Sequence, residues 1–377
     1  MIYLDNAATT KVDKRIVRDM EKYHLKEYGN ASSLHVKGRE AKRAIEKARK
    51  IIAKSIKAKS EEIVFTSGGT EANNLALKGL YFANPEKNHI IISKIEHDCV
   101  LNAARWLEKQ GAKITYLDVD KDGFVDIKQL KKQIRKNTLL VSIIHGNNEI
   151  GTIQDIEKIG KLCKEKNVYF HTDACQSYTK TKIDVKKQNL DLVTLNAHKI
   201  HGPKGVGALY IRKGVKITPL LHGGGHEYGI RSGTENVPGI MGMAYAVKLA
   251  KEKYIKQMEK LRNRLIIGIE EIENVVLNGP KENRLCNNIN FAFNNIEGEA
   301  IGGYLDSYGI ASSTGSACSN LSEGTSHVLK EIGLSDIKAN SSIRLSLSRE
   351  TTEKEIDKTI KILKKVVKRL RMISPIK

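Results

Sequence analysis

The middle of the chain alternates short β-branched runs with stretches in which apolar residues recur every three to four positions. The runs at 139–144, 168–171 and 192–195 predict three buried strands. Between the first two, 156–166 predicts a helix with one apolar stripe. This alternation is typical of an α/β protein, with a mainly parallel sheet that helices cover on both faces.

The pattern continues on both sides of this region. Upstream, the predicted elements are strands at 62–66 and 89–92, flanking a helix at about 71–82. Downstream, the amphipathic segment 240–271 predicts one long helix, after which the pattern of predicted elements changes. There the predicted elements are a strand at 288–293 and a final helix at 352–370. The change indicates a second domain joined to the first by the long helix.

Composition is that of an ordinary globular protein. The chain has 377 residues, and 40% hydrophobic residues with only 6 prolines exclude the disordered and collagen-like classes. Lys and Arg outnumber Asp and Glu by 64 to 43, and the net charge of +21 would attract RNA, acidic proteins or anionic cofactors. The lysines are scattered through most predicted helices, which favours solvated helix faces over a dedicated nucleic-acid surface.

Cysteine usage and the N-terminus bear on the cellular compartment. The five cysteines are far apart, odd in number and never paired as CxxC, so we expect neither a disulfide framework nor a metal site. The N-terminus lacks a basic stretch followed by an apolar core, and no apolar run approaches the length of a membrane span. We therefore expect a cytoplasmic protein with reduced thiols and no membrane partner.

Polar motifs follow several predicted strands, at the edge where ligands bind in doubly wound sheets. Ser67-Gly68-Gly69-Thr70 joins a strand to a helix, and such a turn either holds an anion or uses glycine for geometry alone. Asp173 could hold a pyridinium nitrogen protonated or cap a helix. Lys199 lies between a nearly apolar strand and a glycine-rich turn, where partial desolvation would favour the neutral amine that forms a Schiff base.

The motifs and their order along the chain closely resemble those of the NifS/IscS-like cysteine desulfurases, from about residue 3 to about residue 360. Taken singly, His97 could be a buried histidine, Gln176 a helix-start residue and Arg344 half of a surface ion pair; their joint occurrence favours function. The segments that carry the resemblance are Leu4 to Thr10, Gly29 to His35, Thr66 to Asn74, Glu96-His97, Asn147 to Gly151, His171 to Gln176, Ala197 to Gly205, Arg231 to Thr234 and Ser316-Ala317-Cys318.

The resemblance implies a type I aminotransferase fold and a homodimer. Residues 14–250 would form the large cofactor-binding domain, and 1–13 with 251–377 a smaller α+β domain that carries the loop of Cys318. In the Gly223 to Tyr228 segment, His226 and Tyr228 stand where the family usually has Gln and often a basic residue. This departure bears on the subunit interface and removes no group that the chemistry requires.

The resemblance also implies pyridoxal 5'-phosphate linked to Lys199 through a Schiff base. His97 would stack on the ring and move protons, Asp173 would pair with the ring nitrogen, and Gln176 with the phenolic oxygen. Asn148 and Arg344 would bind the substrate carboxylate, for which a guanidinium is well suited. The implied cofactor-binding residues are Gly69, Thr70, His97, Asn148, Asp173, Gln176, Asn196 (in place of the more common Ser or Thr), His198, Lys199 and Thr234 of the other subunit.

Cys318 lies in a run of small polar residues, which is more typical of a reacting thiol than of a packed one. The resemblance implies that it takes sulfur from L-cysteine as a persulfide, releases alanine, and passes the sulfur to an iron–sulfur scaffold or a tRNA-thiolation enzyme. The other cysteines are expected to pack, with Cys175 beside Asp173 the one exception to watch. A selenocysteine lyase, an aminotransferase and a basic RNA-binding scaffold remain alternatives.

Overall fold

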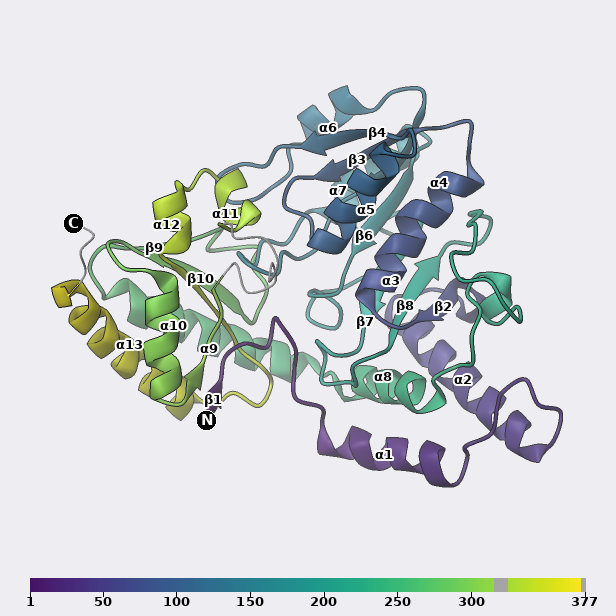
Figure 1. The fold of residues 1–377 in the computed structure, drawn as a ribbon, viewed down its shortest axis with the longest axis horizontal. Helices are drawn as coiled ribbons and strands as arrows, with labels where there is room; N and C mark the ends of the chain where they lie inside the picture. Colours follow the sequence, from purple (N-terminus) through teal and green to yellow (C-terminus); the bar gives the residue numbers. More distant parts are fainter. Residues whose placement is uncertain (315–324, 374–377) are drawn as a thin grey trace.

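Seven strands form the central sheet of the computed structural model, which describes residues 1–314 and 325–373 (Figure 1). Their order is β2-β8-β7-β6-β5-β3-β4. Neighbours from β7 to β4 pair in parallel, and β8 runs antiparallel to both β7 and β2. The predicted mainly parallel sheet is therefore confirmed. The strands are β2 (Ile63–Thr66), β3 (His89–Ser93), β4 (Lys113–Leu117), β5 (Thr138–Ser142), β6 (Tyr169–Asp173), β7 (Leu192–Asn196) and β8 (Gly207–Ile211).

Helices cover both faces of this sheet because successive residues of each strand point to opposite faces. In β3, Ile91 packs into one core while Ile90 and Ile92 pack into the other. The first core includes α1 (Lys14–Leu25), α2 (Val36–Ser55), α6 (Ile127–Gln133), α7 (Ile156–Glu165) and α8 (Val237–Leu249). The second includes a continuous helical run, α3 (Gly69–Asn74), η2 (Leu75–Gly79) and α4 (Leu80–Ala83), and also α5 (Asp98–Glu108). Two 3-10 turns, η1 (Ser60–Glu62) and η3 (Glu227–Gly229), complete this part.

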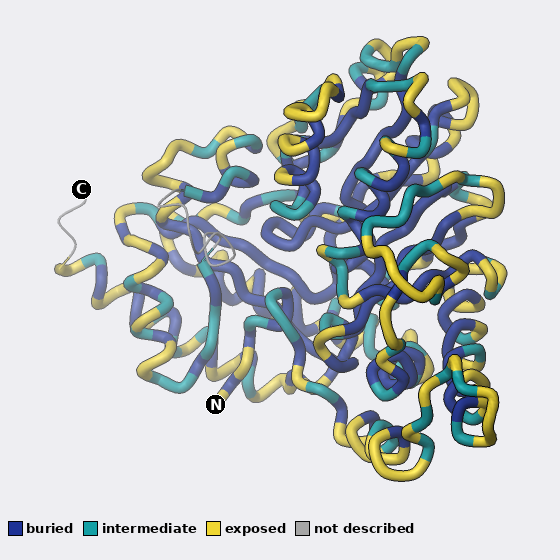
Figure 2. Tube along the Cα trace, turned by 45° about the vertical axis from the view of Figure 1, so that its right-hand side comes forward, coloured by how far each residue is buried: buried dark blue, intermediate teal, exposed yellow. Residues whose placement is uncertain are grey.

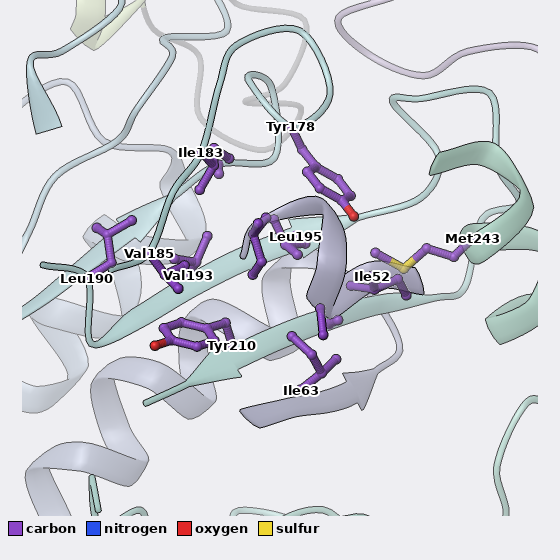
Figure 3. Packing of buried hydrophobic residues seen from close by; sticks show 14 of the residues in the cluster. Ile52, Ile63, Tyr178, Ile183, Val185, Leu190, Val193, Leu195, Tyr210 and Met243 are labelled. Carbon is purple, nitrogen blue, oxygen red and sulfur yellow. The ribbon is translucent and has the colours of Figure 1, made fainter. Parts of the chain in front are cut away.

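Figure 3 shows part of the first core, where Met243 lies beside Ile52 and Tyr210 lies beside Val193. The predicted apolar stripe of α7 is confirmed, since its members are buried in this core. Asp155 begins that helix by accepting a hydrogen bond from the backbone N–H of Lys158. Figure 2 shows the strands buried along most of their length and exposed residues on the outer sides of the helices.

A second group of elements surrounds its own core of aliphatic and phenylalanine side chains, at the left of Figure 1. Ile2 and Leu4 join this core, so the N-terminal segment belongs to it structurally. Boundaries at 14–250 and 251–377 stay a prediction. The elements are β1 (Ile2–Tyr3), α9 (Glu252–Glu270), β9 (Val275–Leu277), β10 (Asn288–Phe293), α10 (Gly298–Ser307), β11 (Ile310–Ala311), β12 (Ser342–Ser346) and α13 (Glu353–Ile373). Two short helices, α11 (His327–Glu331) and α12 (Asp336–Asn340), pack instead in a separate cluster with Ile95, Ile144 and Ile150.

The predicted long helix at 240–271 is wrong, because the chain breaks between α8 and α9. Ala250 and Lys251 are extended, with ψ of 120° and 144°. The two helices have different partners: α8 packs against α1 and α2, whereas α9 packs against α13. One straight helix could not reach both cores, so the chain turns at this junction.

Within residues 1–314 and 325–373, no helix combines the length and apolar character that a membrane span requires.

Candidate active site

The carboxyl ends of five strands of the sheet meet around a cavity of about 230 Å³. These strands, β2, β3, β5, β6 and β7, run in the same direction, so the loops that follow them share one edge. The segment Leu4 to Thr10 adds Ala7 and Ala8. The cavity is lined by Ala7, Ala8, Gly69, Thr70, Asn73, His97, Cys99, Ile144, Asn148, Asp173, Cys175, Gln176, Asn196, His198 and Lys199.

The turn after β2 leads into the helical run that begins at Gly69. A Cβ atom added to Gly69 would lie 2.6 Å from Sγ of Cys175, so a side chain here would force the cavity wall to move. Glu71 accepts a hydrogen bond of 2.7 Å from the backbone N–H of Ser67 and so fixes the turn. Thr70 and the first N–H groups of the helix form the donors of an anion site.

Asp173 ends β6 with both carboxylate oxygens held in place. One oxygen accepts a hydrogen bond of 2.7 Å from the amide of Asn73, and the other a bond of 2.8 Å from the backbone N–H of Cys175. The side chain is buried and forms no ion pair with any described residue. This fixed negative charge is complementary to a cationic N–H group inside the cavity.

His97 caps α5, and its Nδ1 accepts a hydrogen bond of 3.2 Å from the backbone N–H of Cys99. Burial and the charge of Lys199 lower the pKa of His97, so the ring is neutral at pH 7 with its proton on Nε2. The adjacent Glu96 is fully buried. Burial raises its pKa to about 8, although Ser93 and the N–H of Ile144 donate to one oxygen.

Lys199 lies in the turn after β7, and the N-terminal segment clamps this turn. Thr10 donates through its hydroxyl and its backbone N–H to the carbonyl of His198, and its hydroxyl accepts a bond from the N–H of His201. Gln176 donates to the carbonyl of Ala7 and keeps one amide hydrogen available. Burial, followed by the charges of Lys199 and Lys204, lowers the pKa of His198 to about 4.

The structure brings together most of the residues predicted from sequence. Nine of them line the cavity: Gly69, Thr70, His97, Asn148, Asp173, Gln176, Asn196, His198 and Lys199. Thr234 lines a separate, smaller cavity together with Ser67 and Arg231.

Arg344 lies next to the site without lining it. Its buried guanidinium donates to the carboxylate of Asp5 at 2.9 Å and to the backbone carbonyl of Asn148 at 3.2 Å, while its Nε has no hydrogen-bond partner among the described residues.

Cys318 lies outside the described residues, but the chain on either side of its segment contacts the site. Ser313 exchanges two backbone hydrogen bonds with Arg344, at 3.1 and 2.7 Å. On the other side, Ser326 donates to the buried carboxylate of Glu149 at 2.5 Å, and His327 donates from Nε2 to the backbone carbonyl of Glu96. Both flanks are therefore tied to residues that neighbour the cavity.

Sequence analysis missed the role of two lining residues. Asn73 holds Asp173, and its position one helical turn after Thr70, on the same face, is the signal that could have found it. Cys99 was expected to pack only. It does contact the second core, yet it also lines the cavity, because it follows His97 at the start of α5. No rule of residue spacing in the sequence distinguishes a cysteine that packs in a core from one that also lines a cavity. Cys175, flagged for its neighbours, lines the cavity as well.

No group of three or more His, Cys, Asp or Glu side chains is placed to hold a metal ion in the described part of the chain. The model of the family "Aminotransferase class-V" matches residues 2–359. The chain belongs to the aminotransferase class-V family. It is 51% identical to cysteine desulfurase IscS of Dictyoglomus turgidum over 381 residues, covering 100% of this chain and 97% of that protein.

Solved structures agree with this class-V assignment. A NifS-like protein superposes with a TM-score of 0.92 at 40% identity, over 98% of this chain and 100% of the other. SspA in complex with cysteine superposes with a TM-score of 0.84 at 40% identity, over 93% and 100%. The class-V chain thus has the type I aminotransferase fold.

Class-V enzymes use pyridoxal phosphate, and the cavity fits this cofactor. The helix that starts at Gly69 offers N–H donors to a phosphate, Asp173 a carboxylate to a ring N–H, and Lys199 an amine to an aldehyde. Asn73 and Asn196 each keep a buried side-chain oxygen without a partner in the described protein. Such unpaired atoms in a polar cavity are those that a bound polar ligand satisfies.

Proposed function

We propose that the enzyme is a cysteine desulfurase: it converts L-cysteine to L-alanine and keeps the sulfur as a persulfide on Cys318. The observation that carries this is the convergence of Lys199, Asp173 and His97 on one cavity. The similarity to IscS and to the cysteine complex of SspA supports the substrate. A selenocysteine lyase would use the same site. Comparing the turnover rates with selenocysteine and with cysteine distinguishes the two activities.

Three side chains handle the proton of the substrate Cα. Pyridoxal phosphate, when bound, acts as an electron sink that makes this proton acidic. Lys199, which lines the cavity, would be the base that accepts this proton. Asp173, held by Asn73 and by the backbone N–H of Cys175, would bind the N–H of the cofactor ring. His97, neutral at pH 7 and bearing its proton on Nε2, is placed to donate or accept the next proton.

Arg344 and Asn148 would bind the substrate carboxylate. Asp5 accepts a hydrogen bond from one terminal nitrogen of the Arg344 guanidinium, and Nε, which has no partner among the described residues, is a further donor. A carboxylate that replaces Asp5 would meet a guanidinium whose direction is already fixed by its bond to the carbonyl of Asn148.

The sulfur step requires a thiolate, and the four described cysteines are poorly suited to supply one. Burial raises the pKa of every one of these thiols, to about 12 for Cys99 and about 11 for Cys286, and also for Cys163 and Cys175. This leaves Cys318 as the nucleophile. Its thiolate attacks the substrate sulfur, an S–S bond forms as the Cβ–S bond breaks, and the electron pair remains on the carbon skeleton, which leaves as alanine after protonation.

The second subunit of a homodimer would complete each site through Thr234. The segment that carries it is held firmly: Arg231 donates to Glu71 at 2.8 Å, and Arg49 pairs with Glu227 at 2.7 and 2.8 Å. These contacts fix the segment of Thr234 beside the turn after β2, and the described residues that line the cavity of its own chain do not include Thr234. A monomer with full activity in sedimentation and assay would contradict the dimer.

An iron–sulfur scaffold or a tRNA-thiolation enzyme is the proposed sulfur acceptor, and the cytoplasm the proposed location. The basic net charge of +21 suits acidic acceptors.

Cys318→Ser tests the mechanism, with Cys163→Ser as a control that alters a buried cysteine far from the chemistry. Cysteine should still change the cofactor absorbance of Cys318→Ser, whereas release of alanine should fall by several orders of magnitude. Mass spectrometry of the wild type after brief exposure to cysteine should find one added sulfur on the Cys318 peptide. Added sulfur on Cys175 or Cys99 instead, or undiminished turnover in Cys318→Ser, would refute the assignment. Keto-acid formation would favour an aminotransferase.

Lys199→Ala tests cofactor attachment. Borohydride reduction of the wild type should fix the cofactor to the peptide that contains Lys199, and the variant should retain none after reduction and denaturation. Covalent retention by Lys199→Ala would show that another lysine carries the cofactor.

A further inference from the structure

Lys180 places an ammonium group directly against the turn of the cofactor lysine. Its Nζ donates to the backbone carbonyl of Gln176 at 2.7 Å and to that of Lys199 at 3.3 Å. No carboxylate forms an ion pair with it within the described chain. A cation that is held by two carbonyls and lacks an anionic partner is costly to retain, so its position calls for an explanation.

The two carbonyls belong to different loops. Gln176 follows β6 and Lys199 follows β7, so Lys180 joins the two loops that bring both residues to the cavity. The backbone just before it is strained, because Thr179, a β-branched residue, has a φ of 63° in the left-handed region. Strain of this kind persists where the surroundings determine the conformation, and it occurs preferentially at functional sites.

Burial of Lys180 favours its neutral form. Burial, the main cause, and the charge of Lys199 together lower the pKa of Lys180 to about 8, against the opposing effects of Cys286 and Cys175. Burial is the main cause of the lowered pKa of His198 and of His201, and the charge of Lys180 adds a smaller contribution to each, after Lys199 and Lys204 for His198 and after Arg349 for His201. The titratable groups that interact with Lys180 are Lys199, His198, His201, Cys175 and Cys286.

We propose that Lys180 is a positioning residue for the cofactor lysine. It ties the turn of Lys199 to that of Gln176, and its positive charge favours the unprotonated form of the Lys199 nitrogen. This inference rests on the proposed role of Lys199. Like charges at short range disfavour protonation, so the charge of Lys180 acts in the direction that the reaction requires of Lys199.

The test is a pH titration of the cofactor absorbance of the holoenzyme, with three variants. Lys180→Gln removes the charge and keeps a donor, Lys180→Arg keeps the charge, and Lys182→Gln removes an exposed lysine two residues away. Lys180→Gln should move the absorbance midpoint upward by at least about one pH unit, because two unit charges within about 12 Å of each other interact by about 1.4 kcal/mol or more at an effective dielectric constant near 20. Lys180→Arg and Lys182→Gln should leave it within a few tenths. The difference should fade above about pH 8, where Lys180 loses its own charge.

Cofactor affinity gives a second readout, since a loosened Lys199 turn should release the cofactor faster. Dialysis of Lys180→Gln should show release several-fold faster than that of Lys180→Arg. An unchanged midpoint and unchanged release in Lys180→Gln would overturn the proposal. Equal shifts of the absorbance midpoint in Lys180→Gln and Lys180→Arg would also overturn it, because they would show that the effect comes from packing and not from the charge. If the wild type itself shows no cofactor absorbance, the proposed function fails instead, and the two failures are thereby distinguished.

Discussion

Arg49→Met removes the cation from the buried ion pair between Arg49 and Glu227. The side chains of Arg49 and Glu227 are 4% and 3% exposed, and two hydrogen bonds of 2.7 and 2.8 Å join them. A third, of 2.6 Å, runs from Arg49 to the carbonyl of Ile63. In the variant, Glu227 would keep only the backbone N–H of Phe65 as a partner. The buried carboxylate could then avoid an unpaired charge only by binding a proton.

That proton sets the magnitude of the effect. Protonating a carboxyl of ordinary pKa at pH 7 costs about 3.7 kcal/mol, which lies within the range of about 3–5 kcal/mol for breaking a buried pair. We therefore expect Arg49→Met to lower the free energy of unfolding by about 3–4 kcal/mol at pH 7. The variant binds this proton only when folded, so its loss of stability should shrink by roughly 2–3 kcal/mol between pH 7 and pH 5.

Urea unfolding of the apoprotein, followed by circular dichroism at both pH values, measures these differences. Arg264→Met is the matched control: Arg264 also pairs with a carboxylate through two bonds, to Asp357 at 2.6 and 3.0 Å, but the two side chains are 44% and 48% exposed. It should leave stability nearly unchanged. The double variant Arg49→Met/Glu227→Gln should recover most of the loss. Equal losses for the two arginines, or a loss independent of pH, would refute the reasoning.

Three other predictions concern the site. Folding raises the pKa of Glu96 to about 8, so the free energy of unfolding of the wild type should fall relative to that of Glu96→Gln as the pH rises from about 4 to 8. Above pH 8 the difference should stay constant. Urea unfolding at pH 5, 7 and 9 measures it, and a difference that is the same at all three pH values would contradict the prediction. Gly69→Ala should release the cofactor, because the added methyl group meets Cys175; equilibrium dialysis measures the affinity, and wild-type binding would be the contrary result. Arg344→Lys should raise the KM for cysteine roughly 10-fold or more with a smaller effect on kcat, because the bidentate contact of the guanidinium with the substrate carboxylate is lost. An unchanged KM in steady-state assays would exclude Arg344 as the carboxylate-binding residue.

The strands and the motifs that follow them could be predicted from the sequence because their signals are local. Ile90, Ile91 and Ile92 form an apolar run that suits a strand buried on both faces, and β10 coincides with its prediction. Since parallel strands place their carboxyl ends at one edge, Thr70, Asp173 and Lys199 could be expected to meet. The local pattern and this topological rule placed the motifs at one edge, whereas the roles of the nine cavity residues were implied by the resemblance to the NifS/IscS-like cysteine desulfurases.

Other features depend on contacts between distant parts of the chain. The break at Ala250 and Lys251 arises because α8 and α9 pack into different cores, and no local pattern records which core a helix joins. The bond from Asn73 to Asp173 and the contact of Lys180 with the Lys199 turn join residues whose partners only folding selects. The protonation of Glu96 likewise follows from its burial. Desolvation and hydrogen-bond geometry depend on the complete packing around a group, so these properties belong to the tertiary structure alone.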